Sequence, residues 1–567
     1  MTNKQLLYLP LLLFIFLAVN FSGGDSPPST VHRLPSAIHN LQSEIQPAPY
    51  RELSRYISSM RAAPSISGGL RQYAPAKRLS PAVGEEKLLV ILIEFSDVTH
   101  SAEHTPEYFD HLLFSKAPGD KSMWNYYQEC SYGQFFISPG SEANNPTPWL
   151  RSDHTLAYYN DLEESNGAIW KLAEEALEKA AQAGVDFSSY DEDKNGLVDH
   201  LVVVHAGGAE EDTSMSKDLG SHRWEIKTTG QGYTLQAETS PMGIFAHEFG
   251  HDLGLPDLYI DSNHFLIYDW ALMDHGAWLG EPPGSSPAHP CPWSKALLGW
   301  ITPVEASSCG PVREVWAIEI HQQESLFRLS TANPKEYFLV SNHQRTSFDA
   351  YLPGEGILIW HIDDSIGCIE CNDVNSNPFH PRVYLEQADG RDDLRHNGKA
   401  DAGDPYSKTG AKDHFGVNTI PNSRDYNEAP TGIEIKVCDA PGEVMKVVMK
   451  RNCGEATEND CEKVTTKTYV AANPFVISQY PEGVGIYLEP AAANPTISIY
   501  DLNGELVHTE TGGENVLLVD SKGKERWANK FPWDGRNEAD REVASGVYVY
   551  IIETESKTMT GKLAVIR

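Results

Sequence analysis

The stretch His247-Glu248-Phe249-Gly250-His251-Asp252-Leu253-Gly254-Leu255-Pro256-Asp257 carries the pattern HExxHxxGxxD, and we expect it to form a helix followed by a turn. A helix places His247 and His251 on one face, where both imidazoles can bind one zinc ion. Glu248, between them, can act on a metal-bound water. Gly254 can adopt the left-handed backbone that ends a helix, and the turned chain would return Asp257 as a third ligand. Three protein ligands leave one coordination position open, which is typical of a catalytic zinc site.

A second element follows at Trp270-Ala271-Leu272-Met273-Asp274. Its Met273 is expected to form the methionine turn that lies beneath the zinc in metzincin-type peptidases. Core packing is the alternative for this methionine, and a solvated helix with two histidines is the alternative for HExxH. The glycine and the aspartate at the extended spacing favour the zinc site.

Length and charge limit what the chain can be. Its 567 residues are too many for one hydrophobic core, so several domains are expected. The 45 basic and 79 acidic residues give a formal net charge of -34. We therefore expect no nucleic acid as a partner, because its phosphates would be repelled.

The N-terminal residues 1–24 have the pattern of a secretory signal peptide. Lys4 precedes an apolar run from Leu6 to Val19, which small and turn-forming residues follow. The run is short for a transmembrane helix, although an uncleaved anchor is the alternative. We expect a secreted or cell-surface protein with no stable membrane insertion after signal cleavage. Residues 25–84, rich in Pro, Ser, Arg and Ala, are expected to be a propeptide, with a flexible linker as the alternative.

The remaining chain predicts an α+β protein with three folded parts. The apolar run Lys87–Phe95 indicates a buried strand, and a catalytic domain is expected at 85–300. Short apolar runs alternating with turns indicate a β-rich domain, continuous with it, at 301–452. A polar linker at 453–466 then leads to regularly spaced strands, which predict a β-sandwich at 467–567.

Eight cysteines in an exported chain permit disulfides. Cys368 and Cys371 form a single CxxC, which favours a small disulfide loop or bonds to more distant cysteines over a structural zinc site. The sequence leaves the pairing open.

The stretch 191–199 reads DxDxNGxxD, in which oxygens at alternate positions can converge on a hard cation. We expect calcium there. A solvated turn is the alternative, because Val202 stands where an EF-hand has its bidentate glutamate. The expected ligands are Asp191, Asp193, Asn195, Asp199 and the backbone carbonyl of Leu197. A second acidic segment, 389–404, is expected to be a solvated loop rather than a further cation site.

From about Leu88 to Val448 the chain resembles the immune inhibitor A family of secreted bacterial metallopeptidases. The resemblance implies a metzincin-like zinc endopeptidase, secreted as a zymogen, with calcium helping to hold the fold. It implies His247, His251 and Asp257 as zinc ligands and Glu248 as general base. Family members often have small residues where Asp274 and His275 stand, so the pocket can differ here. The matching stretches are Ile93–Asp97, Tyr127–Gly133, Tyr190–Gly196, His205–Gly207, Ser221–Trp224, His247–Tyr259, Leu272–Trp278, Trp293–Lys295 and Leu298–Trp300.

The C-terminal unit resembles the immunoglobulin-like modules that end many exported bacterial proteins. The likeness rests on Asn473–Phe475, Tyr500–Gly504, Trp533–Gly535 and Ala544–Tyr548. Some such modules are type IX secretion signals that are removed at the cell surface, and others stay attached. Secretion machinery is therefore an expected partner.

Together these patterns predict a secreted zinc metalloendopeptidase, a hydrolase that cleaves proteins or peptides with zinc-activated water and Glu248 as the base. Tyr259 and Tyr268 are candidates for stabilising the oxyanion, with core packing as the alternative. The competing hypothesis is a zinc-stabilised adhesion or binding protein without turnover. The intact Glu248 argues against it, because a structural zinc site does not need that carboxylate.

Overall fold

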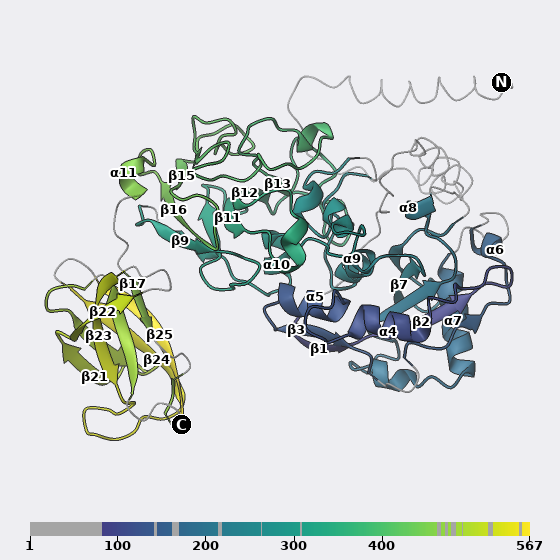
Figure 1. The fold of residues 1–567 in the computed structure, drawn as a ribbon, viewed down its shortest axis with the longest axis horizontal. Coiled ribbons are helices and arrows are strands. Elements are labelled where there is room, and N and C mark those ends of the chain that lie inside the picture. The colour runs from purple at the N-terminus through teal and green to yellow at the C-terminus, as the bar shows by residue number, and fades with distance from the viewer. Residues whose placement is uncertain are drawn as a thin grey trace, which may run out of the picture. The chain divides into compact units, whose positions relative to one another are not determined.

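The computed structural model is a mixed fold of helices and several β-sheets (Figure 1), in agreement with the predicted α+β class. It describes residues 82–140, 145–160, 169–213, 218–261, 264–306, 309–461, 467–470, 475–477, 483–489, 491–519, 525–554 and 558–567. The expected signal peptide and nearly all of the expected propeptide lie outside these residues. None of the helices in the described ranges has the length and apolar character needed to cross a membrane.

A five-stranded sheet in the order β4-β2-β5-β7-β6 organises the first part of the chain. The strands are β4 (Leu150–Arg151), β2 (Leu89–Glu94), β5 (Leu201–His205), β7 (Gly232–Ala237) and β6 (His222–Glu225). Neighbouring strands run parallel except for the edge strand β6, which is antiparallel to β7. The buried strand predicted within 87–95 is confirmed as β2.

Strand β2 separates two hydrophobic cores because its side chains alternate between the faces of the sheet. Val90 and Leu92 pack into one core, and Ile91 and Ile93 pack into the other. Helix α7 (Trp170–Gln182) covers the second face. On the first face lie α4 (Pro106–Phe114), α5 (Met123–Cys130) and α9 (Met242–Asp252).

Shorter elements complete this part. They are β1 (Gly84–Lys87), β3 (Phe135–Ser138), α6 (Leu156–Asn160), η2 (Phe187–Tyr190), α8 (Glu210–Thr213), η3 (Tyr268–Trp270), η4 (His275–Trp278) and α10 (Pro292–Leu297). Ala82 already belongs to the fold, because its N–H donates to Leu298 O and its carbonyl accepts from Trp300 Nε1.

Two further sheets follow, in the orders β13-β12-β11-β10-β8 and β14-β15-β16-β9. Residues of both pack into one apolar core, whereas Leu339, Trp360 and Leu385 join the core that lies under α9. The elements are β8 (Val304–Glu305), β9 (Arg313–Trp316), β10 (Leu326–Ser330), β11 (Glu336–His343), η5 (Ser347–Tyr351), β12 (Gly356–Asp363), β13 (Val383–Leu385), η6 (Leu394–His396), β14 (His414–Phe415), β15 (Ile433–Val437), β16 (Val444–Arg451) and α11 (Glu458–Cys461).

The C-terminal residues form two sheets around their own core. One sheet has the order β17-β19-β23-β22 and the other β18-β25-β24-β20-β21. The strands are β17 (Lys467–Val470), β18 (Phe475–Val476), β19 (Val484–Glu489), β20 (Thr496–Tyr500), β21 (Leu506–Thr511), β22 (Glu514–Val519), β23 (Glu525–Trp533), β24 (Gly546–Glu553) and β25 (Thr558–Ile566).

Three disulfides join six of the eight cysteines. Cys368 pairs with Cys371, Cys309 with Cys453, and Cys438 with Cys461, while Cys130 and Cys291 are buried thiols. The start of the expected linker, through Cys461, is thus covalently attached to the preceding β-rich part.

A buried ionic network ties the end of α9 to the sheet. His200 Nδ1 lies 2.6 Å from Asp252 Oδ2 and its Nε2 lies 3.4 Å from Glu86, while Arg223 Nε donates to Asp252 Oδ1 at 3.3 Å. Burial alone would lower the pKa of His200, but Asp252 and then Glu86 raise it from 6.5 to about 9.

We expect His200 to stabilise the fold in a pH-dependent way. Because its folded pKa is raised, the contribution is complete below the unfolded value of 6.5 and disappears as the pH rises through about 9. The difference in Tm between the wild type and His200→Gln should therefore shrink between about pH 6 and pH 10. Thermal melts in matched buffers measure it, and a difference that does not change with pH would contradict this assignment.

Candidate metal centre

Helix α9 presents His247, Glu248 and His251 on a buried surface, each 0% exposed. Two glycines allow close packing around the helix. A Cβ on Gly243 would lie 2.0 Å from Ala277 O, and one on Gly250 would lie 2.7 Å from Met273 Sδ. Met273 thus packs directly against the turn of α9 that carries the two histidines.

Backbone carbonyls fix the orientation of both imidazoles. His247 Nδ1 lies 2.9 Å from Leu272 O, and His251 Nδ1 lies 2.8 Å from Leu255 O. Because a carbonyl oxygen only accepts hydrogen bonds, each Nδ1 carries a proton, and the lone pair of the neutral ring lies on Nε2. Carbonyl partners of this kind orient histidines that bind metals.

Asp257 returns to the histidines through the predicted turn, in which Gly254 has a φ of 99°. The Nε2 atoms of His247 and His251 each lie 3.2 Å from Asp257 Oδ1. These three atoms are buried and have no hydrogen-bond partner among the described residues. Two imidazole nitrogens and one carboxylate oxygen that converge in this way fit a zinc ion with an open coordination position.

The buried side chains of His251 and Asp257 shift each other's pKa. Burial alone would lower the pKa of His251, but the charge of Asp257 raises it to about 9. Burial alone would raise the pKa of Asp257, but the histidines, His251 first, hold it well below its usual range. A proton on His251 therefore competes with a metal ion for the same nitrogen. Metal affinity is expected to decrease as the pH is lowered.

Glu248 is the unpaired carboxylate of the centre. Both of its carboxylate oxygens are buried without a hydrogen-bond partner in the described structure. Burial, with a smaller contribution from the charge of Asp257, raises its pKa to about 8. A carboxyl group with a pKa near neutrality can both accept and release a proton.

Asn372 holds the third candidate ligand and was not predicted from the sequence. Its Nδ2 donates to Asp257 Oδ2 at 2.6 Å, and its Oδ1 accepts from the Asp257 N–H at 2.6 Å. It directly follows the Cys368–Cys371 loop and has a φ of 54°, which asparagine tolerates better than most residues. The only sequence signal near it is the CxxC, and that pattern does not point to the metal site.

We expect Asn372→Ala to lower zinc affinity about 10–100-fold, the usual cost of losing an outer partner of a metal ligand. The backbone of Asp257 would stay in place, but its carboxylate would lose the hydrogen bond that orients it. Competition with a chromophoric chelator measures the affinity. Ser376→Ala in the same turn is the control, and equal affinities for both variants would contradict the role.

The two candidate tyrosines lie in different surroundings. Tyr259 is buried with its ring 6.4 Å from that of His247, and burial followed by the charge of Asp257 raises its pKa well above the usual value. Tyr268 stacks on His275 at 4.4 Å. Of the two, Tyr259 is therefore the one that lies beside the candidate ligand His247.

The candidate calcium residues form a compact loop. Asp191 accepts from the N–H groups of Asn195 and Gly196, both at 3.0 Å, and Asp199 accepts from that of Glu192 at 2.6 Å. Within the described ranges, these aspartates do not form a group whose ligand atoms all lie within 4.8 Å of one another. Calcium at this loop remains a prediction.

The acidic segment 389–404 brings Asp389, Asp393 and Asp401 together. Arg391 contacts Asp389 at 3.2 Å and Asp401 at 3.0 Å. The Arg391 guanidinium thus contacts two of the three carboxylates of this partly exposed cluster.

Known proteins resemble parts of this chain. The family model "Immune inhibitor A peptidase M6, catalytic domain" matches residues 223–300. Immune inhibitor A of Bacillus thuringiensis subsp. alesti is 27% identical over 302 residues, which cover 41% of this chain and 43% of that protein. Pre-pro-metalloprotease PrtV of Vibrio cholerae serotype O1 (strain M66-2) is 28% identical over 281 residues, covering 38% and 29%. The chain thus spans less than half the length of these relatives.

Two solved structures from Porphyromonas gingivalis also match. PorZ, described as a surface component of the type-IX secretion system, is 25% identical with a TM-score of 0.13, covering 24% of this chain and 15% of PorZ. Dimeric latent PorU is 15% identical with a TM-score of 0.15, covering 25% and 14%. Scores this low support no argument about fold. The match at residues 223–300 contains His247, Glu248, His251 and Asp257, so the resemblance to the immune inhibitor A peptidases that the sequence predicted is confirmed for this part of the chain.

Proposed function

We propose that this protein is a secreted zinc endopeptidase that hydrolyses peptide bonds of protein substrates. The observation that carries the proposal is the convergence of His247, His251 and Asp257 beside an unpaired, buried Glu248. A centre that only stabilised the fold would have no use for that carboxylate. The metalloprotease names of the relatives support the same activity.

In this proposal, His247, His251 and Asp257 hold the zinc ion, and Glu248 moves the proton. The ion, when bound, lowers the pKa of a bound water and polarises the scissile carbonyl. Glu248 accepts a proton from the attacking water and then delivers it to the leaving amine nitrogen. Asn372 would keep Asp257 oriented, and Tyr259 would donate to the developing oxyanion.

We propose a metzincin-like arrangement for the catalytic part, supported by Met273 packed against α9 and by the antiparallel edge strand β6. An extended substrate would add to this edge by backbone hydrogen bonds. Such binding gives little side-chain selectivity, so the substrates are expected to be varied proteins.

The terminal segments support export. We propose that residues 1–24 direct secretion, that 25–84 keep the enzyme latent, and that the C-terminal pair of sheets is an immunoglobulin-like module that secretion machinery can recognise. The name Pre-pro-metalloprotease of the PrtV relative fits a chain made with removable N-terminal segments.

Calcium at Asp191, Asp193, Asn195, Leu197 and Asp199 would stabilise the turn between η2 and β5. We expect a calcium-selective chelator to lower the Tm, since an ion that binds only the folded state stabilises it by mass action. Differential scanning calorimetry with EGTA, followed by added Ca²⁺, measures the shift. An unchanged Tm would leave the loop as an ordinary turn.

Casein hydrolysis separates the proposed enzyme from a non-catalytic binding protein. We expect the mature protein to cleave casein, to lose activity with 1,10-phenanthroline, and to regain it with added Zn²⁺. Absence of cleavage by protein that holds zinc at His247, His251 and Asp257 would favour the binding protein.

A further inference from the structure

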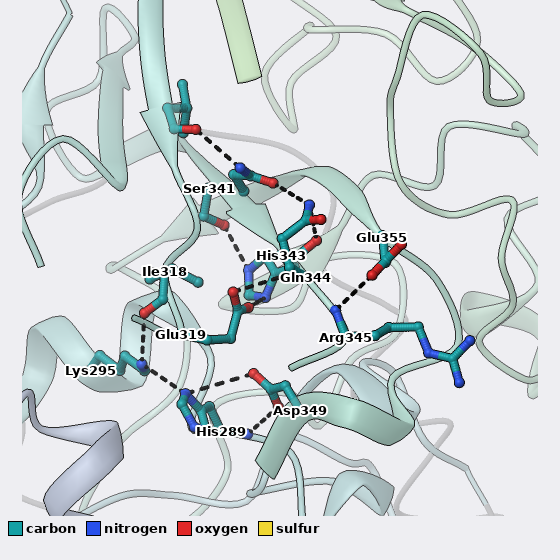
Figure 2. A network of polar contacts seen from close by, with 12 residues as sticks. His289, Lys295, Ile318, Glu319, Ser341, His343, Gln344, Arg345, Asp349 and Glu355 are labelled. Carbon is teal, nitrogen blue, oxygen red and sulfur yellow. Dashed lines mark hydrogen bonds and ion pairs between the residues drawn. The ribbon is translucent and has the colours of Figure 1, made fainter. Parts of the chain in front are cut away.

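A second group of buried metal-ligating side chains lies outside the proposed catalytic centre. It consists of Glu319, His343 at the end of β11, and Asp349 in η5 (Figure 2). One ligand atom of each lies within 4.8 Å of the others, and the three residues are 1%, 4% and 1% exposed. They come from three separate segments, so only the fold brings them together.

Glu319 points an unsatisfied oxygen into this group. Its Oε2 accepts from the Gln344 N–H at 3.2 Å, but its Oε1 has no hydrogen-bond partner in the described structure. Oε1 lies 3.1 Å from His343 Nδ1 without the geometry of a hydrogen bond. The same signature, close ligand atoms without hydrogen bonds, marks His247, His251 and Asp257.

Lys295 lies beside the group and makes its hydrogen bonds outside it. Its Nζ donates to His289 Nδ1 at 3.1 Å and to Ile318 O at 3.4 Å (Figure 2). It also donates to the Tyr132 hydroxyl at 3.4 Å. In the described part of the chain, no lysine or arginine nitrogen lies within the 4.0 Å of an ion pair with Glu319 or Asp349.

His289 also lies beside the group. Its Nδ1 lies 3.7 Å from Asp349 Oδ2 and accepts a hydrogen bond from Lys295, and its Nε2 lies 3.0 Å from Glu129 Oε1. The carboxylates of Glu319 and Asp349 are thus buried close together without a lysine or arginine in ion-pair contact among the described residues, an arrangement that is costly unless a bound ion compensates it.

His343 is oriented as a ligand. Its Nε2 lies 2.9 Å from Ser341 Oγ, which also accepts from Trp360 Nε1 at 3.1 Å. With the proton on Nε2, donated to Ser341, the Nδ1 lone pair faces Glu319. A ligating histidine usually has its second ring nitrogen held by such an outer partner.

We propose that Glu319, His343 and Asp349 bind a divalent cation with a structural role. One imidazole nitrogen and two carboxylates suit zinc or manganese. Because the ligands are buried, the ion would be taken up as the chain folds. It would join β11 and the loop at Glu319 to η5, which already contacts the segment after Met273 through Asp349 Oδ1 and the His289 N–H at 2.8 Å.

The site can be tested apart from peptidase activity. In the full chain, His247→Ala with His251→Ala removes the first centre, and we expect elemental analysis to find one remaining equivalent of zinc or manganese. Adding Glu319→Gln or Asp349→Asn should reduce this metal content at least about tenfold, because losing even an outer partner of a metal ligand usually costs about 10–100-fold in affinity. Glu355→Gln, an exposed position in the same region, is the control and should keep the metal.

A second measurement covers variants that fold poorly. Full-length protein with the first centre removed is stripped with a chelator and titrated with Co²⁺, whose visible absorbance reports nitrogen and oxygen ligation. Saturation at one equivalent, together with a higher Tm in Zn²⁺ or Mn²⁺, supports the site. No bound metal and no shift in Tm would overturn the proposed site. Glu319, His343 and Asp349 would then be a cluster that shares a proton. Either result is independent of whether Glu248 supports hydrolysis.

Discussion

Glu248→Gln is expected to keep a full equivalent of zinc and to lose about 10²–10⁴-fold in kcat, the usual contribution of a general acid–base. The substitution preserves the shape of the side chain but leaves no group that can accept a proton. Metal retention is expected because the candidate ligand atoms belong to His247, His251 and Asp257. Stopped assays on a quenched peptide, with zinc measured on the same samples, give both quantities.

The control for Glu248 is Glu178→Gln, at an exposed position on α7, which covers the other face of the sheet. It removes the same charge away from the proposed substrate edge and should leave kcat nearly unchanged. A Glu248→Gln enzyme with normal turnover would remove the general base from the mechanism. Loss of zinc from that variant would instead make Glu248 part of the binding site.

Asp257→Ala is expected to have the second largest effect and to abolish zinc retention at the centre of His247 and His251 during purification. It removes one of three converging ligands, and it also leaves the Asn372 amide unpaired in a buried position. Zinc affinity should therefore decrease in the order wild type, Asn372→Ala, Asp257→Ala. Activity should fall in parallel and return only at high zinc concentration. An Asp257→Ala protein with wild-type affinity would show that another group is the third ligand.

The sequence predicted the local parts of the metal centre well. The spacing of His247 and His251 on a helix and the positive φ at Gly254 follow from backbone geometry within a few residues. The buried strand β2 was likewise readable from a continuous apolar run. These features depend on local periodicity, which a single sequence displays.

Contacts between distant segments could not be predicted in this way. Asn372 is 115 positions from Asp257, and its position depends on the path of the chain through β11, β12 and the following turn. The group of Glu319, His343 and Asp349 comes from three segments without a shared motif. The disulfide partners were also undetermined, because eight cysteines allow many pairings and the fold selects among them.

The cross-links Cys309–Cys453 and Cys438–Cys461 have a mechanical consequence. A force that pulls on the chain beyond Cys461 reaches covalent bonds before it reaches the hydrogen bonds of β15 and β16. The load would pass to Cys438 at the end of β15 and to Cys309 before β9. The two disulfides carry the load, so that force applied to the C-terminal module does not separate the strands of the sheet that precedes it.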